Sequence, residues 1–342
     1  MRIVSPLLKH VVYPGLSRSG YLRRSASAAP AVVTYHGILP SGYEVRDPVL
    51  DGHLVLPEAF VRQIRLLKSR YNVISPEEFL GWREGELRLP PRSVLLTCDD
   101  GLRNTLTDML PLMREFNVPF LFFVTGGSLT DESSMLWYEQ VFLWLLESGE
   151  KISQARARWR EMIRKLSAFD AGARNQILQD MRTQLGISED FESEYSQNQA
   201  VRRRFFMLNL TELRELADAG MTIGAHTLSH PMLSQMPEDL ALQEISQSRA
   251  GLQAALGKPV WALAYPFGNL EAVSEREPEL AERAGFRCAF MNVEGGVGAG
   301  WFGFPRIHVS STTTAAELEA HVSGFYRTVR EKYLQADAGV SA

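Results

Sequence analysis

Short apolar runs rich in β-branched residues alternate along this chain with segments of helical periodicity. In one such segment, residues 57–70, Phe60, Ile64 and Leu67 lie on one helical face, and Pro57 stands in the first turn. Alternating strands and helices favour a parallel sheet or barrel, because parallel neighbours need a crossover connection. The expected strands are 31–36, 72–74, 93–98, 120–125, 221–225, 260–265, 287–291 and 304–309, and further helices are expected at 102–116, 237–256, 271–284 and 315–333. The sequence therefore predicts an α/β fold built on a parallel sheet or barrel.

Residues 131–210 interrupt this alternation with a polar, helical stretch. Strand signals vanish inside it and resume after it, so it is interpreted as an insertion on the barrel rather than a separate domain. Its aromatic opening, 136–145, is expected to pack on the barrel flank, with a substrate lid or partner surface as the alternative. The run Arg202–Arg204 is expected on a solvated face. The predicted division is 1–30 as an N-terminal extension, 31–335 as the barrel with its insertion, and 336–342 as a mobile tail.

Composition limits the possible partners. The 342 residues are 45% hydrophobic, enough for a large core, and carry a net charge of −4. Because there is no overall basic field, nucleic acid is not an expected partner. Cys98 lies inside an apolar run far from Cys288, so neither a disulfide nor a metal-binding pair is expected.

The sequence offers no candidate transmembrane segment and no clear secretory signal. The densest apolar run, 141–146, is too short to cross a bilayer. Near the N-terminus, the arginines follow the apolar residues 11–13 rather than preceding them. A cytoplasmic location is expected, and a membrane-surface role for residues 1–28 stays open as an alternative. The oligomeric state is not predicted.

Two adjacent carboxylates, Asp99 and Asp100, follow the buried strand 93–98. Neighbouring residues of a strand point to opposite faces, so both can reach one site only if the chain turns there, as Gly101 permits. The C-terminal ends of parallel strands carry the active sites of barrels. Alone, the Asp-Asp-Gly triplet favours a turn in which Asp100 caps the next helix.

Two histidines, His226 and His230, follow a second predicted strand. A spacing of four brings imidazoles to one side of a helical turn, but Pro231 disfavours helical geometry at His230, so a tight loop is equally consistent. With Asp100 they resemble a set of two histidines and one carboxylate that leaves open positions on a divalent ion, with zinc as the expected metal. The other aspartate would then be free to act as a base for metal-assisted hydrolysis.

These motifs resemble those of a known family. Residues 97–101 (TCDDG) and 226–230 (HTLSH) are similar to the first two motifs of the polysaccharide deacetylases, the NodB-homology group or carbohydrate esterase family four, and 265–268 (YPFG) resembles the third. The resemblance runs from about residue 31 to 309, with 131–210 unmatched.

The resemblance implies a distorted (β/α) barrel of about seven parallel strands that removes acetyl groups from N-acetylated sugars. It further implies Asp99 as the general base, with Asp100, His226 and His230 as the metal ligands. Metal-activated water would attack the acetamide, and the backbone N–H of Phe267 would stabilise the oxyanion together with the metal.

Two features depart from the family pattern. The arginine that usually precedes the third motif and orients the catalytic aspartate is absent from 261–264, and the late leucine-rich histidine motif is also absent. Strand alternation places Arg306 and His308 on one side of the late strand. We therefore expect Arg306 to pair with Asp99 and keep it ionised. His308 is the candidate general acid, and a histidine hydrogen-bonded at the barrel rim is the alternative.

Two other residues are candidates for contact with substrate. His36 ends the first strand and is expected to line the site or support a ligand. Trp301 lies in the glycine-rich loop 295–303, where it is expected to stack on a sugar ring or to anchor the loop.

The leading prediction is a metal-dependent deacetylase acting on an N-acetylated glycan or glycan precursor. An amidase acting on a non-sugar amide is an alternative, because the ligand set addresses the bond and not the ring. A non-catalytic glycan-binding barrel is a third, although a binder would not need an intact base at Asp99.

Overall fold

The computed structural model describes residues 6–24, 29–126, 129, 134–294 and 300–330. Its centre is one parallel sheet with the order β8-β7-β6-β5-β4-β3-β1-β9, and β2 pairs with the first half of β3. The strands are β1 Ala31–Tyr35, β2 Asn72–Ile74, β3 Ser93–Cys98, β4 Leu121–Val124, β5 Thr222–Ala225, β6 Ala262–Ala264, β7 Cys288–Met291, β8 Phe304–Pro305 and β9 Ile307–His308. Each lies within a predicted strand, so the expected α/β class is correct.

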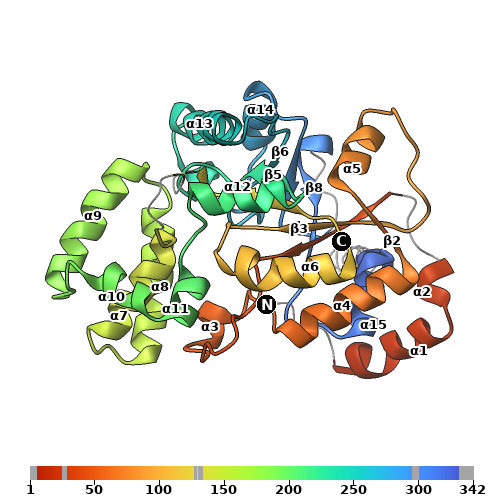
Figure 1. Ribbon diagram of the computed structural model, residues 1–342, viewed down its shortest axis with the longest axis horizontal. Coiled ribbons are helices and arrows are strands. Elements are labelled where there is room, and N and C mark those ends of the chain that lie inside the picture. The colour runs from red at the N-terminus through yellow and green to blue at the C-terminus, as the bar shows by residue number, and fades with distance from the viewer. Residues whose placement is uncertain (1–5, 25–28, 127–128, 130–133, 295–299, 331–342) are drawn as a thin grey trace, which may run out of the picture.

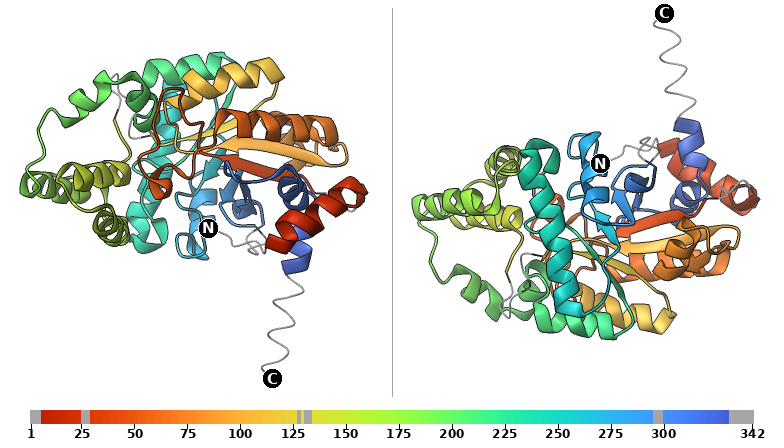
Figure 2. Two further views of the ribbon diagram at one scale, coloured as in Figure 1. Left: turned by 90° about the horizontal axis from the view of Figure 1, so that it is seen from below. Right: turned by 90° about the horizontal axis from the view of Figure 1, so that it is seen from above.

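A short segment closes this sheet into a distorted barrel. Strand β8 pairs with β7 and β9 pairs with β1, and the two strands are separated only by Arg306. Residues 304–308 thus join the two ends of the sheet. Figure 2 shows the strands between the helices of residues 137–205 on one side and the N-terminal helices on the other. If β8 and β9 are counted as one strand, the barrel has seven parallel strands, in agreement with the expected fold.

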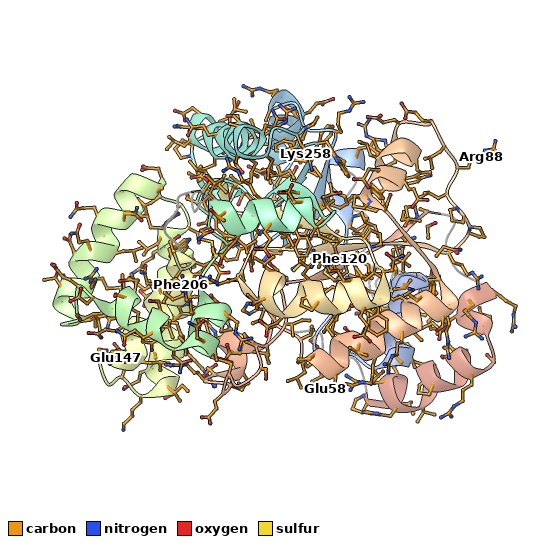
Figure 3. The ribbon with its side chains drawn as sticks, viewed as in Figure 1. Glu58, Arg88, Phe120, Glu147, Phe206 and Lys258 are labelled. Atoms are coloured by element: carbon orange, nitrogen blue, oxygen red, sulfur yellow. The ribbon has the colours of Figure 1, made fainter. Side chains whose placement is uncertain are left out.

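Helices cover the outside of the barrel (Figure 1). These are α4 Pro57–Arg70, α5 Pro76–Arg83, α6 Leu110–Phe116, α12 Leu210–Asp218, α13 Glu238–Leu256, α14 Arg276–Arg283 and α15 Ala315–Val322. Three of them begin with reciprocal capping boxes, Ser75 with Glu78, Asn209 with Glu212 and Thr314 with Glu317. Apolar helix faces and strands bury a common core, in which Phe120 is fully covered (Figure 3).

Three predicted helices differ from the structure. The helix expected at 271–284 begins only at Arg276, and residues 271–275 are not helical. Residues 102–116 form a π-helical turn, Thr105–Met109, before α6, and Pro111 cannot donate the backbone hydrogen bond of a continuous helix. The predicted helix 315–333 is interrupted after Val322, because Gly324 adopts a φ of 80°. The predicted tail, 336–342, lies outside the described residues.

Five helices between β4 and β5 gather on one side of the barrel (Figure 1, left). They are α7 Trp137–Glu147, α8 Ile152–Leu166, α9 Ala171–Gln184, α10 Phe191–Gln197 and α11 Gln199–Phe205, and they have an apolar cluster of their own. Phe206 is buried where this group meets the barrel (Figure 3).

The expectation that Arg204 is solvated is wrong. Arg204 is fully buried and donates to the carboxylates of Asp51 and Glu139, at 2.7 and 2.8 Å, and to the carbonyl of Leu50. A buried guanidinium needs such partners, and sequence alone did not indicate them. The contacts attach α11 and α7 to the short helix α3 (Pro48–Asp51).

The N-terminal residues pack against the barrel. The helical turns η1 Leu8–Val12, α1 Tyr13–Arg18 and α2 Tyr21–Arg24 bury Tyr13 and Leu22 against Ala320 of α15. Among the described residues, no helix combines the length and the apolar character required to span a bilayer.

Candidate active site

A cavity of about 400 Å³ opens at the C-terminal ends of the barrel strands. Both carboxylates that follow β3 and both histidines that follow β5 line it. The complete lining is His36, Val49, Leu50, His53, Asp99, Asp100, Tyr138, Trp159, Ile163, His226, His230, Tyr265, Phe267, Asn292 and His308. Residues separated by more than two hundred positions in the sequence therefore share one pocket.

Left-handed backbone turns both aspartates into this cavity. Asp100 has a φ of 74° and Gly101 a φ of 79°, so the chain leaves strand geometry as soon as β3 ends. A side chain at Gly101 would also bring a Cβ within 2.9 Å of Val124. Asp99 and Asp100 are each 2% exposed. The turn thus explains how adjacent residues reach one site.

Asp100, His226 and His230 form a group whose ligand atoms lie within 4.8 Å of one another. Both histidine Nε2 atoms lie 3.4 Å from Asp100 Oδ1. The loop between the histidines is not helical, since Thr227 and His230 have φ values of 63° and 56°. Of the two conformations expected for residues 226–230, a helical turn or a tight loop, the structure has the tight loop.

The donor set fits a divalent cation. His226 Nδ1 lies 2.8 Å from the Ala264 carbonyl, so this nitrogen carries the proton and Nε2 turns a lone pair towards Asp100. The second carboxylate oxygen of Asp100, Oδ2, is buried and has no hydrogen-bond partner. Converging acceptors with no donor between them are what a cation would satisfy.

Arg306 holds Asp99 beside this group. Its two terminal nitrogens donate to the two oxygens of Asp99, both at 2.6 Å, which is the bidentate geometry of a strong ion pair. The guanidinium is 1% exposed and stacks over Phe123 at 5.3 Å. Burial raises the pKa of Asp99, but the Arg306 guanidinium lowers it below the ordinary value. Asp99 is therefore ionised and fixed in orientation.

Three further histidines lie on the same side of the cavity. His36 Nε2 is 3.9 Å from Asp99 Oδ2, and the His36 ring contacts those of His308 and His53 at 5.2 and 5.6 Å between centroids. The structure thus brings His36 and His308 to the site as expected. It also adds His53, which sequence reasoning missed, because only the folded 37–56 segment brings that residue back over β1.

Phe267 and Trp301 have different surroundings. Phe267 follows β6 in a left-handed conformation, φ 59°, with its ring 5.0 Å from that of His230. Trp301 does not line the cavity. It packs edge-on against Trp82 at 5.0 Å and stacks on Phe304, which is the loop-anchor arrangement. Phe267 remains a candidate, and Trp301 does not.

The helices of residues 137–205 contribute directly to the pocket. Tyr138, Trp159 and Ile163 line it, and the Tyr138 ring lies 5.1 Å from that of His230. Their helical spacing is equally typical of simple core packing, so no sequence signal distinguished them.

The same helices support the backbone of the histidine loop. Trp137 Nε1 donates to the His230 carbonyl at 3.2 Å, and Arg174 Nη2 donates to the Ser229 carbonyl at 2.8 Å. Arg174 is 2% exposed, and its guanidinium lies 5.0 Å from the centroid of the Trp137 ring. A pair of side chains from α7 and α9 therefore holds the end of this loop.

Glu244 of α13 supports the loop from the barrel side. Its carboxylate accepts hydrogen bonds from the backbone N–H groups of Leu228 and Ser229, at 2.9 and 2.8 Å, and one from the Ser229 hydroxyl. The left-handed residues of the loop are thus held between α13 and the helices of 137–205.

A sequence model described as "Polysaccharide deacetylase" matches residues 87–182 and 191–289, more than half of the chain. The chain belongs to the polysaccharide deacetylase family. As a member of this family, the protein is a hydrolase, a carbohydrate N-deacetylase. The match includes most of 131–210, so the expectation that this stretch lies outside the resemblance is wrong. No curated protein sequence matches the chain.

Solved structures share the fold. A deacetylase from Streptococcus pyogenes, PplD, in complex with acetate is 18% identical with a TM-score of 0.56, over 86% of this chain and 97% of that one. A de-N-acetylase from Aggregatibacter actinomycetemcomitans is 14% identical with a TM-score of 0.56, over 85% and 98%. IcaB from Ammonifex degensii is 17% identical with a TM-score of 0.55, over 87% and 98%. At these identities the likeness to the solved structures shows the fold alone.

Proposed function

We propose that this polysaccharide deacetylase removes N-acetyl groups from a glycan or glycan precursor with Asp99 as general base and a divalent cation on Asp100, His226 and His230. One observation supports this assignment above all. The three ligand atoms converge within 4.8 Å, while Asp99 stands beside them in a separate ion pair with Arg306. Adjacent carboxylates thus have separate partners, as a ligand and a base require.

The donor set favours zinc, which binds two imidazoles and a carboxylate and keeps a position open in catalytic sites. A cation bound there would supply an acidified water molecule and polarise the acetamide carbonyl. The chain's own residues would position the substrate and move the protons.

Asp99 would accept the proton of the attacking water. Arg306 occupies one lone pair on each oxygen of Asp99, and a carboxylate oxygen has a second lone pair with which to accept a proton. A guanidinium carries N–H donors and no acceptor, so Arg306 cannot itself act as a base. Its role is to keep Asp99 ionised and aimed into the cavity.

Departure of the amine requires a proton from a second group. We propose His308 for this step, since it lines the cavity beside His36. His36 would position the base, because its Nε2 faces Asp99 Oδ2. The backbone N–H of Phe267 is proposed as the oxyanion donor, on the basis of its left-handed turn next to His230.

The test is acetate release from N-acetylglucosamine oligomers by protein loaded with zinc. Asp99→Asn should abolish release while the bound metal stays stoichiometric, because Asn cannot accept the proton. Arg164→Gln, at an exposed position on α8, is the matched control and should keep full activity. Acetate from simple anilides but not from sugars would indicate a non-sugar amidase. Binding of oligomers without any acetate would indicate a glycan-binding barrel. Either result would overturn the proposal.

A further inference from the structure

The N-terminal region differs in charge from the rest of the molecule. The first 43 residues contain five lysines and arginines and no aspartate or glutamate, although acidic residues outnumber basic ones in the whole chain, 40 to 36. Arg18 and Arg24 are exposed on α1 and α2. A basic segment on an acidic protein indicates an anionic partner.

A cationic cleft of about 420 Å³ lies beside these helices. Its lining comes from α2, the end of α4, the start of β2 and the turn before β3, and includes Arg23, Lys68, Arg70 and Arg92 but no acidic side chain. Because it lies at the N-terminal ends of the parallel strands, it is at the opposite end of the barrel from the catalytic cavity.

The cleft is organised from beneath by a buried carboxylate. Glu319 of α15 is fully buried and pairs with Arg23 at 3.1 Å and with Arg70. Arg70 also donates to the Ser17 hydroxyl of α1 at 2.9 Å, which ties the cleft to the N-terminal helices. One carboxylate therefore fixes two cations, and the four cations keep a surplus of positive charge.

Two apolar side chains face solvent on the same helical segment. Leu7 is 62% exposed and Val11 is 61% exposed, and their spacing of four places them on one face. The other side of the segment faces the protein, since the half-buried Leu8 packs against Tyr13 and Ala320 of α15. Figure 1 shows α1 and α2 together at one end of the molecule, beside α4 and α15.

We propose that this end of the protein docks on a membrane surface that contains anionic phospholipids. Lipid phosphates occupy the cleft of Arg23, Lys68, Arg70 and Arg92, and Leu7 and Val11 enter the boundary between headgroups and acyl chains. A soluble polyanion would use the cleft but would gain nothing from the two apolar side chains. Docked in this way, the catalytic cavity faces away from the bilayer.

Co-sedimentation with phosphatidylcholine vesicles, with and without about one quarter phosphatidylglycerol, tests the proposal. The protein should bind the anionic vesicles and not the neutral ones. Leu7→Asp with Val11→Asp, and separately Lys68→Glu with Arg92→Glu, should each weaken binding about tenfold or more. Leu270→Asp is the matched control, because Leu270 is 65% exposed elsewhere, and its binding should not change.

Circular dichroism and deacetylation of a soluble oligomer establish that each variant is folded. If the charge-reversed pair does not fold, the Leu7 and Val11 pair decides, since both positions are exposed. Absence of binding to anionic vesicles would overturn the proposal. Binding unaffected by the apolar pair would also overturn it, and so would binding of dextran sulfate or inorganic phosphate without vesicles, which would reveal a site for soluble anions.

Discussion

At the residue scale, the site depends on how two adjacent aspartates are given different surroundings. Asp100 faces two imidazoles and Asp99 faces a guanidinium, and the left-handed turn at Asp100 and Gly101 separates them. The residue types were readable from the sequence. The pairing of Asp99 with Arg306 was expected because the arginine that usually precedes the family's third motif is absent and Arg306 offers a replacement. The positions of His53 and Arg204 could not be predicted, because a local sequence pattern does not indicate contacts with residues far away in the chain.

Arg306→Gln should reduce kcat for deacetylation about 10- to 100-fold, the usual effect of removing a supporting hydrogen-bond partner. Without the guanidinium, Asp99 loses its fixed orientation and its nearest compensating charge. Steady-state kinetics alongside metal analysis would check this. If metal content fell together with kcat, Arg306 would act on the ligand group rather than on the base.

Glu139 should make stability depend on pH. Burial raises its pKa from 4.5 to about 7, although Arg204 opposes the shift, and Asp51 already compensates the Arg204 charge. An acid with a raised folded-state pKa stabilises the fold fully below its unfolded pKa. That contribution, roughly 3 kcal/mol at most, is lost as pH rises through about 7.

Denaturant unfolding of the wild type and Glu139→Gln between pH 5 and 8 isolates this contribution. As pH increases, the free energy of unfolding of the wild type should fall relative to that of Glu139→Gln. A difference that is constant over this range would show that Glu139 is ionised throughout.

At the element scale, strands were more predictable than helices. The strand 93–98 was predicted with the bounds it has, because a fully buried parallel strand is a continuous apolar run flanked by turns. The helix 315–333 was predicted as continuous, but the chain turns at Gly324 and residues 325–330 form a separate helical stretch. Periodicity reports which face is apolar, not what covers it.

That limit applies above all to residues 137–205. We propose to describe α7–α11 as an insertion of the barrel rather than a separate domain, because its residues line the catalytic cavity and support the histidine loop. The sequence indicated helices with an aromatic face. It could not indicate that Trp137 and Arg174 would reach the backbone of Ser229 and His230.

Arg174→Gln should weaken zinc affinity about 10- to 100-fold, because the carbonyl of Ser229 loses a charged donor and His230 is no longer held in its left-handed conformation. Competition with a chelating dye would measure the affinity directly. Arg164→Gln is again the control, and it should bind zinc as the wild type does. Equal affinities for both variants would mean that α9 is not required for the ligand geometry.

At the scale of the whole molecule, the barrel brings together groups from segments that are far apart, and the helices of 137–205 close one side of the site. The assignment of this protein to the polysaccharide deacetylases rests mainly on the family match over more than half of the chain. Binding of a cation by ligands that follow two different strands, β3 and β5, should also stabilise the complete fold.

Zinc should therefore raise the free energy of unfolding, by ~2.7 kcal/mol at a free concentration one hundred times Kd. Calorimetry after chelation and then with added zinc would measure the change in Tm. His230→Ala should unfold at the same temperature under both conditions. A wild-type Tm that does not respond to zinc would contradict a shared site.

The most direct measurement is anomalous diffraction at the zinc edge from crystals grown with the metal. We predict one strong peak at the cavity, about 2.0–2.2 Å from an Asp100 oxygen and from Nε2 of both His226 and His230. Asp99 should stay outside the coordination sphere, still paired with Arg306. A peak that excludes either histidine, or one coordinated by Asp99, would contradict the proposed division of roles.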